Sequence, residues 1–175
     1  MSRLIRAFAA CAALALPWAA HAQASGDWIH DAQKSFYAAT VNDSGNVFGQ
    51  WCDPQDRSCT YLVAFPASCR DGARYPALAN GDGGADSVTL ICRGALDGRN
   101  AEGRPLYRYA FENFDQVDTL VRGSRRIGIA FPIDGDAFRV LRFSLAGSQT
   151  AIATMRGAVE RGPAPGRQNT RDQRL

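Results

Sequence analysis

The 175-residue sequence is poor in lysine and histidine, and it has no apolar run long enough to cross a membrane. Lys34 is the only lysine, so arginine supplies 19 of the 20 basic side chains. The two histidines, His21 and His30, cannot build a metal site that needs several imidazole ligands. The longest apolar stretch, residues 7–16, is shorter than the roughly 20 residues that span a bilayer. These shortages argue against a membrane-spanning protein and against a multi-histidine metal centre.

The composition is that of a globular domain, with 46% hydrophobic and 21% charged residues. The formal net charge of +3 comes from the ends of the chain. Without Arg3 and Arg6 the charge is +1, and residues 163–175 alone carry +2, so the rest is close to −1. We therefore predict one domain that does not bind nucleic acid.

The N-terminus has the pattern of an export signal. Arg3 and Arg6 precede an apolar run, which is followed by a small-x-small site ending at Ala22. The pattern predicts a Sec signal peptide over residues 1–22, cleaved after Ala22 or, alternatively, after Ala24. We therefore expect a periplasmic or secreted protein.

The cysteine count agrees with export. Cys11 lies in the leader, which leaves Cys52, Cys59, Cys69 and Cys92, an even number that predicts disulfides in an exported domain. Four cysteines allow three connectivities, of which we favour Cys52–Cys59 and Cys69–Cys92. The first pair flanks a turn-rich segment whose two sides read as strands, so a hairpin would bring its thiols together. The alternative is a zinc site, but the cysteine spacings lack the short pairs that such sites use.

Alternating apolar residues and turn clusters predict a strand-rich chain that ends in a mixed segment. Strands are expected over residues 35–41, 47–52, 59–65, 87–92, 106–111, 126–133 and 137–145. Residues 66–86 and 94–104 are expected to be loops. Pro132 cannot donate to a ladder, so its strand should end at a sheet edge.

Two helices are expected in the C-terminal half. Asn113 can cap a helix that runs to Arg122 and stops at Gly123. Ser148 can cap a last helix to about residue 161, with Ile152 on its apolar stripe.

These elements predict a mainly β fold with two short helices, either an antiparallel β-sandwich or a β-barrel-like single domain that is disulfide-bonded. The predicted division of the chain is a signal peptide over 1–22, a flexible linker over 23–34, a β-rich domain over 35–162 and a disordered basic tail over 163–175.

The segment from Tyr107 to Ile152 resembles the end of the invasion-associated locus B family. It has a strand, a short helix that ends in glycine, two more strands and then the Ser-Leu-x-Gly element at residues 144–147. Trp51, with Cys52 and Cys59, also resembles an early tryptophan and cysteine pair of that family. The resemblance implies an exported β-rich fold and a role in host interaction, and it transfers no catalytic residues.

The sequence predicts neither catalytic nor cofactor-binding residues. His30 lies near Asp27 and Asp31, in the expected linker, where an exposed position is favoured over a catalytic base. Asp134 and Asp136 are best explained by a hairpin turn.

The glycine-rich segment near residue 82 has some features of a metal or phosphate site. Asp82 and Asp86 straddle glycines, but Ile91 stands where a calcium loop needs a late carboxylate. Gly81, Gly83 and Gly84 do not open a helix, so no phosphate cradle is expected. We therefore predict no metal site.

Two surface-like features have ordinary explanations. Tyr107, Tyr109 and Phe111 share one strand face, which we interpret as a core face in preference to a binding platform. Arg125 and Arg126 form the densest basic pair, which we interpret as a solvated turn.

The sequence therefore favours an exported, non-enzymatic protein that binds a protein or an envelope component of unknown identity. One alternative is a periplasmic inhibitor of a lysozyme-like hydrolase, which would present the 66–86 loop anchored by Cys69. A second alternative is a small hydrolase that uses Asp residues and an Arg.

Overall fold

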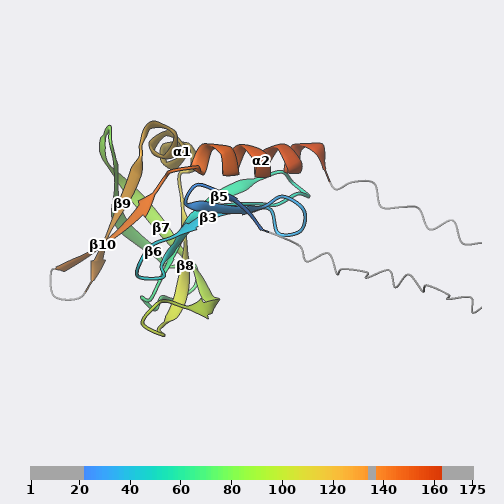
Figure 1. Ribbon diagram of the computed structural model, residues 1–175. Helices are drawn as coiled ribbons and strands as arrows, with labels where there is room; N and C mark the ends of the chain where they lie inside the picture. The colour runs from blue at the N-terminus through green and yellow to red at the C-terminus, as the bar shows by residue number, and fades with distance from the viewer. Residues whose placement is uncertain (1–21, 134–136, 163–175) are drawn as a thin grey trace, which may run out of the picture.

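The computed structural model describes residues 22–133 and 137–162 (Figure 1). The signal peptide predicted up to residue 22 falls almost wholly outside this range, as do the expected turn at Asp134 and Asp136 and the expected tail over 163–175. The described residues form one antiparallel sheet and two helices.

Twelve elements follow one another along the described chain. The strands are β1 (Gln23–Ser25), β2 (Trp28–Asp31), β3 (Tyr37–Val41), β4 (Val47–Cys52), β5 (Cys59–Phe65), β6 (Arg74–Gly81), β7 (Gly84–Arg99), β8 (Pro105–Phe111), β9 (Arg126–Ile133) and β10 (Ala137–Ser144). The helices are α1 (Phe114–Gly123) and α2 (Ser148–Arg161). The predicted fold class, a mainly β single domain with two helices and disulfides, is confirmed.

The sheet has the strand order β1-β2-β3-β4-β5-β8-β7-β6-β9-β10, and it curls until its last strand meets its first ones. The indole Nε1 of Trp28 in β2 donates to the carbonyl of Ser144 at the end of β10, over 2.9 Å. Inside, the rings of Phe48 in β4 and Phe143 in β10 lie 5.5 Å apart. The architecture is therefore a single curled sheet, which matches the barrel-like form of the prediction.

The two helices close the core from outside the sheet. In Figure 1, α2 runs along the top of the domain beside α1. Helix α2 packs mainly on β2 and β3, and α1 packs on β5 and β6. The predicted stripe of α2 is buried, because Ile152, Met155 and Val159 are at most 7% exposed. Neither described helix has the length and apolar composition of a membrane span.

The predicted start of α1 is confirmed, whereas that of α2 differs. Asn113 caps α1, and its side chain accepts a hydrogen bond from the N–H of Gln116 over 3.1 Å. Ser148 does not cap α2 but is its first, buried residue, and Gly147 holds the cap position with φ 89°. A Cβ on Gly147 would lie 1.8 Å from the carbonyl of Ser25, so the approach of the N-terminal chain requires glycine there.

The structure corrects the flexible linker expected over residues 23–34. Strands β1 and β2 lie in this range, and Trp28 and His30 are 0% and 4% exposed. Charged residues around Trp28 obscured the alternation of β2. Asp31 ends the strand by accepting backbone N–H bonds from Gln33, Lys34 and Ser35. These bonds, that from Gln33 most of all, lower the pKa of its carboxyl against the opposing effect of burial.

The structure also corrects the two expected loops. Residues 66–86 contain all of β6 and the start of β7, and β7 continues through Arg99 into the second expected loop. The sequence pattern of strand β6 is weak, because its buried side chains, Ala77 and Ala79, are small and because it contains Pro76. The loop suggested for a hydrolase inhibitor is thus reduced to residues 66–73 and the turn before β7.

Both predicted disulfides are confirmed. Cys52–Cys59 joins directly opposed residues of β4 and β5. Cys69–Cys92 fastens the segment before β6 to β7. Each bridge constrains the unfolded chain and should stabilise the fold by about 2–4 kcal/mol.

Two prolines set the limit of pairing between β6 and β9. Leu78 lies opposite Ala130 in this ladder, and the same register would place Pro76 opposite Pro132. Neither proline has an N–H to donate, and the ladder stops before this pair. Pro132 therefore marks the end of pairing on one side of its strand, although the edge strand of the sheet is β10.

Candidate functional site

A groove with a volume of about 460 Å³ lies between α1 and α2. Its floor is the Tyr61 side chain of β5. Its walls come from the two helices: Asp118, Val121, Arg122, Gln149, Ile152, Ala153, Arg156, Gly157 and Glu160. The groove thus combines an apolar wall with two arginines and two carboxylates.

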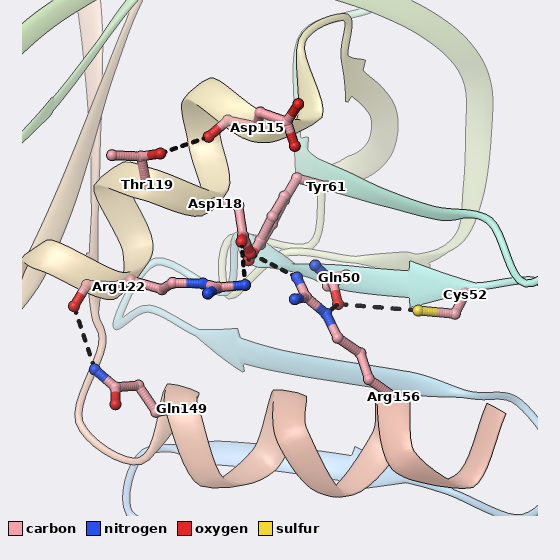
Figure 2. A network of polar contacts seen from close by, with 9 residues as sticks. All are labelled: Gln50, Cys52, Tyr61, Asp115, Asp118, Thr119, Arg122, Gln149 and Arg156. Atoms are coloured by element: carbon pink, nitrogen blue, oxygen red, sulfur yellow. Dashed lines mark hydrogen bonds and ion pairs between the residues drawn. The ribbon is translucent and has the colours of Figure 1, made fainter. Parts of the chain in front are cut away.

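Asp118 of α1 is the centre of the polar contacts in this groove (Figure 2). Its Oδ1 accepts hydrogen bonds from the Tyr61 hydroxyl over 2.8 Å and from Arg156 Nη2 over 2.5 Å. Its Oδ2 forms an ion pair with Arg122 Nη2 at 2.6 Å, one helical turn away. Residues from β5, α1 and α2 therefore converge on one carboxylate.

Arg156 connects this centre to the sheet. Its Nε donates to the Gln50 Oε1 of β4 over 2.7 Å, and its guanidinium carbon lies 5.3 Å from the centre of the Phe114 ring. That distance allows a cation–π contact. Gln50 is fully buried, and its Nε2 has no hydrogen-bond partner among the described residues. Cys52 Sγ lies 3.9 Å from the Gln50 oxygen, but a disulfide sulfur has no hydrogen to donate.

The local fold explains why these side chains meet. Asp118 and Arg122 are four residues apart on α1, so they face the same way and form an i,i+4 pair. Gln149 at the start of α2 donates to the carbonyl of Arg122 over 3.2 Å and ties the two helices together at the head of the groove. Arg156 follows the buried Met155 and reaches back across the helix interface.

The electrostatics hold Asp118 ionised and Tyr61 protonated. Burial raises the pKa of the Asp118 carboxyl, but the hydrogen bonds from Arg156 and Tyr61 outweigh it and leave the pKa below its usual range. Burial, followed by the hydrogen bond to Asp118, raises the pKa of the Tyr61 hydroxyl well above its usual range. Neither group changes its protonation state near neutral pH, so the arrangement is a fixed set of donors around a fixed charge.

The histidine considered as a catalytic base lies outside the groove. His30 is buried in β2, and neither of its ring nitrogens has a hydrogen-bond partner among the described residues. Its expected exposed position was therefore wrong, and no Ser-His-Asp arrangement forms around it in the described chain.

The segment weighed as a calcium or phosphate site is the turn between β6 and β7. Asp82 accepts hydrogen bonds from the side chain and backbone of Arg125, which lower the pKa of its carboxyl. Asp86 lies exposed in β7. The described residues contain no cluster of three His, Cys, Asp or Glu side chains placed for a metal ion.

The aromatic face predicted to be core is confirmed as core. Tyr109 and Phe111 are buried, and the Tyr109 ring stacks on Phe65 with 4.7 Å between the ring centres. The Tyr109 hydroxyl donates to the carbonyl of Ala67 over 2.8 Å. Tyr107 is half-buried at the edge of the core.

Nothing in the sequence pattern marks Asp118, Arg122 and Arg156 as members of one site. One signal was present: Gln50 occupies an inward position of β4 between Phe48 and Cys52, and a buried amide requires a polar partner. The identity of that partner, 106 residues further on, could not be deduced from spacing.

The fold and the groove define a small, disulfide-bonded, antiparallel β protein whose last helix closes the core. No family model and no curated protein matches the chain. Among solved structures, the chain is similar to the crystal structure of invasion associated protein B from Bartonella henselae. The TM-score is 0.52 at 14% identity, over 79% of this chain and 97% of that chain. This similarity confirms, at the level of the fold, the resemblance to the invasion-associated locus B family.

Proposed function

We propose that this chain is an exported, non-enzymatic binding protein that acts in the envelope or at the surface of a host. The two disulfides support an extracytoplasmic location, because such bonds persist in oxidising compartments. The leader pattern supports export. Cleavage after Ala22 would leave β1 whole, whereas cleavage after Ala24 would remove two of its three residues, so the first site is preferred.

The state of Asp118 carries the proposal that the groove binds without catalysis. A hydrolase that depends on aspartate needs a carboxylate free to take a proton or to attack a substrate. Both oxygens of Asp118 are already engaged by Tyr61, Arg122 and Arg156, and its pKa is lowered by those contacts against the effect of burial. Such a carboxylate is a weak base and a poor nucleophile, but it holds two arginines in place.

The ligand chemistry that suits the groove is a carboxylate next to a short apolar group. Arg122 and Arg156 place two positive charges around the single charge of Asp118, and their contacts leave further N–H donors on both guanidiniums. An arginine can bind a carboxylate through two parallel hydrogen bonds. Ile152 supplies an apolar wall. The negative charge of Glu160 at the end of α2 repels a carboxylate, which favours binding of the ligand carboxylate at Arg122. A free peptide C-terminus has this chemistry.

A peptide titration tests the ligand assignment. A short peptide that ends in leucine with a free carboxylate should bind the mature protein, and the same peptide with an amidated end should bind at least about tenfold more weakly. Arg122→Gln should weaken binding of the free acid similarly, because this side chain is 65% exposed and its loss leaves the buried contacts in place. Arg125→Gln, an exposed arginine outside the groove, is the matched control. Equal binding of the two peptides would refute the assignment.

A separate assay tests the absence of catalysis. The mature protein is incubated with cell-wall and glycan substrates, and no turnover is expected. Turnover by the wild-type chain that disappears in Asp118→Asn, with the fold checked by circular dichroism, would establish the hydrolase alternative instead.

A further inference from the structure

An exposed apolar row crosses the outer face of β6, β9 and β10. Leu78, Ala130 and Val140 lie directly opposite one another across these three strands, and Phe138 lies opposite Pro132. Leu78, Val140 and Phe138 are 46%, 45% and 61% exposed. Single exposed apolar side chains are ordinary, whereas a contiguous row of them on neighbouring strands is the kind of feature that interaction surfaces present.

The same row borders an open strand edge. Leu145, the residue after the end of β10, donates its N–H to the carbonyl of Arg125, on the side of β9. Phe138 lies opposite Pro132, which has no N–H to donate. Because backbone groups alternate along a strand, those of Phe138 and Val140 point away from β9. Strand β10 is last in the sheet order, and its outward edge is covered only toward its end, where the carbonyls of Arg142 and Ser144 accept from Asn42 and Trp28. The described chain provides no ladder partner on that side for Phe138 and Val140.

The two edges of the sheet differ in how they are protected. Natural edge strands avoid self-pairing by being short, charged or covered. Strand β1, the other edge, has three residues, of which two are exposed and none is a large apolar residue. Strand β10 has eight residues, and its outward face begins with Phe138 and Val140 before the first charge at Arg142. The β10 edge is therefore the one that can accept another strand.

We infer that β10 pairs antiparallel with β10 of a second copy of this chain, about a two-fold axis at Val140. In this register Val140 faces its own copy, and Phe138 faces Arg142 of the other chain. Arg139 faces Leu141, so no two arginines are directly opposed. A guanidinium over an aromatic ring is a favourable cation–π pair.

This self-complementarity favours a second copy over a foreign strand. A two-fold axis uses each contact twice, so the Phe138–Arg142 pair forms on both sides of Val140. In the dimer the Arg142 carbonyl accepts a hydrogen bond from the N–H of Phe138 of the other chain. It gives up the exposed 3.3 Å hydrogen bond that it accepts from the Asn42 side chain. The apolar row of each chain then continues across the joined sheets.

Measurement of mass in solution tests the pairing. The mature chain, beginning at residue 23, should show twice its monomer mass by light scattering after gel filtration. Val140→Lys should reduce the mass to that of the monomer, because two ammonium groups would meet at the axis. Ile29→Lys is the matched control, since Ile29 is 40% exposed on β2 and is not part of the proposed ladder, and that variant should stay dimeric. Near-ultraviolet circular dichroism verifies that both variants are folded.

Cross-linking tests the register. Val140→Cys places two thiols on directly opposed residues, about 5.5 Å apart at the Cα atoms, and oxidised glutathione should convert them to an intermolecular disulfide. Phe138→Cys places the thiols four residues out of register, roughly 13 Å apart, and should not cross-link. A monomer at every concentration of the wild-type chain, or cross-linking through position 138 in preference to 140, overturns the proposal.

Discussion

Replacing Asp118 with asparagine should lower the free energy of unfolding by about 2–4 kcal/mol. The change keeps the shape of the side chain but removes the charge that Arg156 and Tyr61 contact. Hydrogen bonds to charged groups contribute about 1.5–3 kcal/mol each, and two are affected. The side chains of Asp118 and Arg156 are 12% and 23% exposed, so water recovers part of the loss and the sum is reduced. The Arg122 contact adds less than about 1 kcal/mol, because that side chain is 65% exposed.

The loss should depend on pH in a defined direction. The pKa of Asp118 is lower in the folded than in the unfolded chain, so its stabilisation is complete above the pKa of the unfolded carboxyl, near 3.9, and is lost as the pH falls through the folded value. The difference in stability between the wild-type chain and Asp118→Asn should therefore be constant above about pH 5 and shrink at lower pH.

Urea denaturation followed by tryptophan fluorescence measures both effects. Asp115→Asn is the matched control, because Asp115 is an exposed aspartate in the first turn of the same helix, and it should cost less than about 1 kcal/mol. An Asp118→Asn variant within about 0.5 kcal/mol of the wild type, or as stable as the control at every pH, would refute the reasoning that the network stabilises the fold.

Three further predictions follow from the packing. Ile152→Ala should lower the free energy of unfolding by about 2–5 kcal/mol in a denaturant melt, because this residue of α2 is only 7% exposed. An unchanged midpoint would show that this face of α2 lies in solvent. Gly147→Ala should lower the melting temperature markedly, since its φ is 89° and a Cβ would meet the carbonyl of Ser25, whereas an unaltered melt would contradict this approach. N-terminal sequencing of the protein from a periplasmic fraction should begin at Gln23, and recovery of Met1 would refute cleavage.

The sequence predicted the strands whose inward residues are large. The bounds of β4, β5 and β9 agree with the prediction, because residues such as Phe48, Tyr61 and Ile129 make the alternation plain. It missed β6, whose inward residues are alanines, and β1, which has three residues and no large apolar one. It also missed β2, where neighbouring charges conceal the alternation. Size and hydrophobicity carry the signal of a strand, so a strand that packs with small side chains reads as a loop.

The groove could not be predicted in the same way. A half-buried arginine beside the apolar stripe of a helix, such as Arg156, has the same local pattern as a solvated one. Its partner Asp118 lies 38 residues earlier on another helix, and the contact exists only because the sheet sets those helices side by side. Pairing of charges between elements is a property of the packing, which one-dimensional periodicity does not contain.

The hydrogen bond between Trp28 and Ser144 spans 116 residues of chain. Until residue 144 has been synthesised, the first strands lack the contact that closes the sheet, so no earlier fragment can complete the core. Contacts of such long range are formed late and slow the folding of β proteins. Helix α2, which follows Ser144 in the chain and packs on β2 and β3, then completes the core.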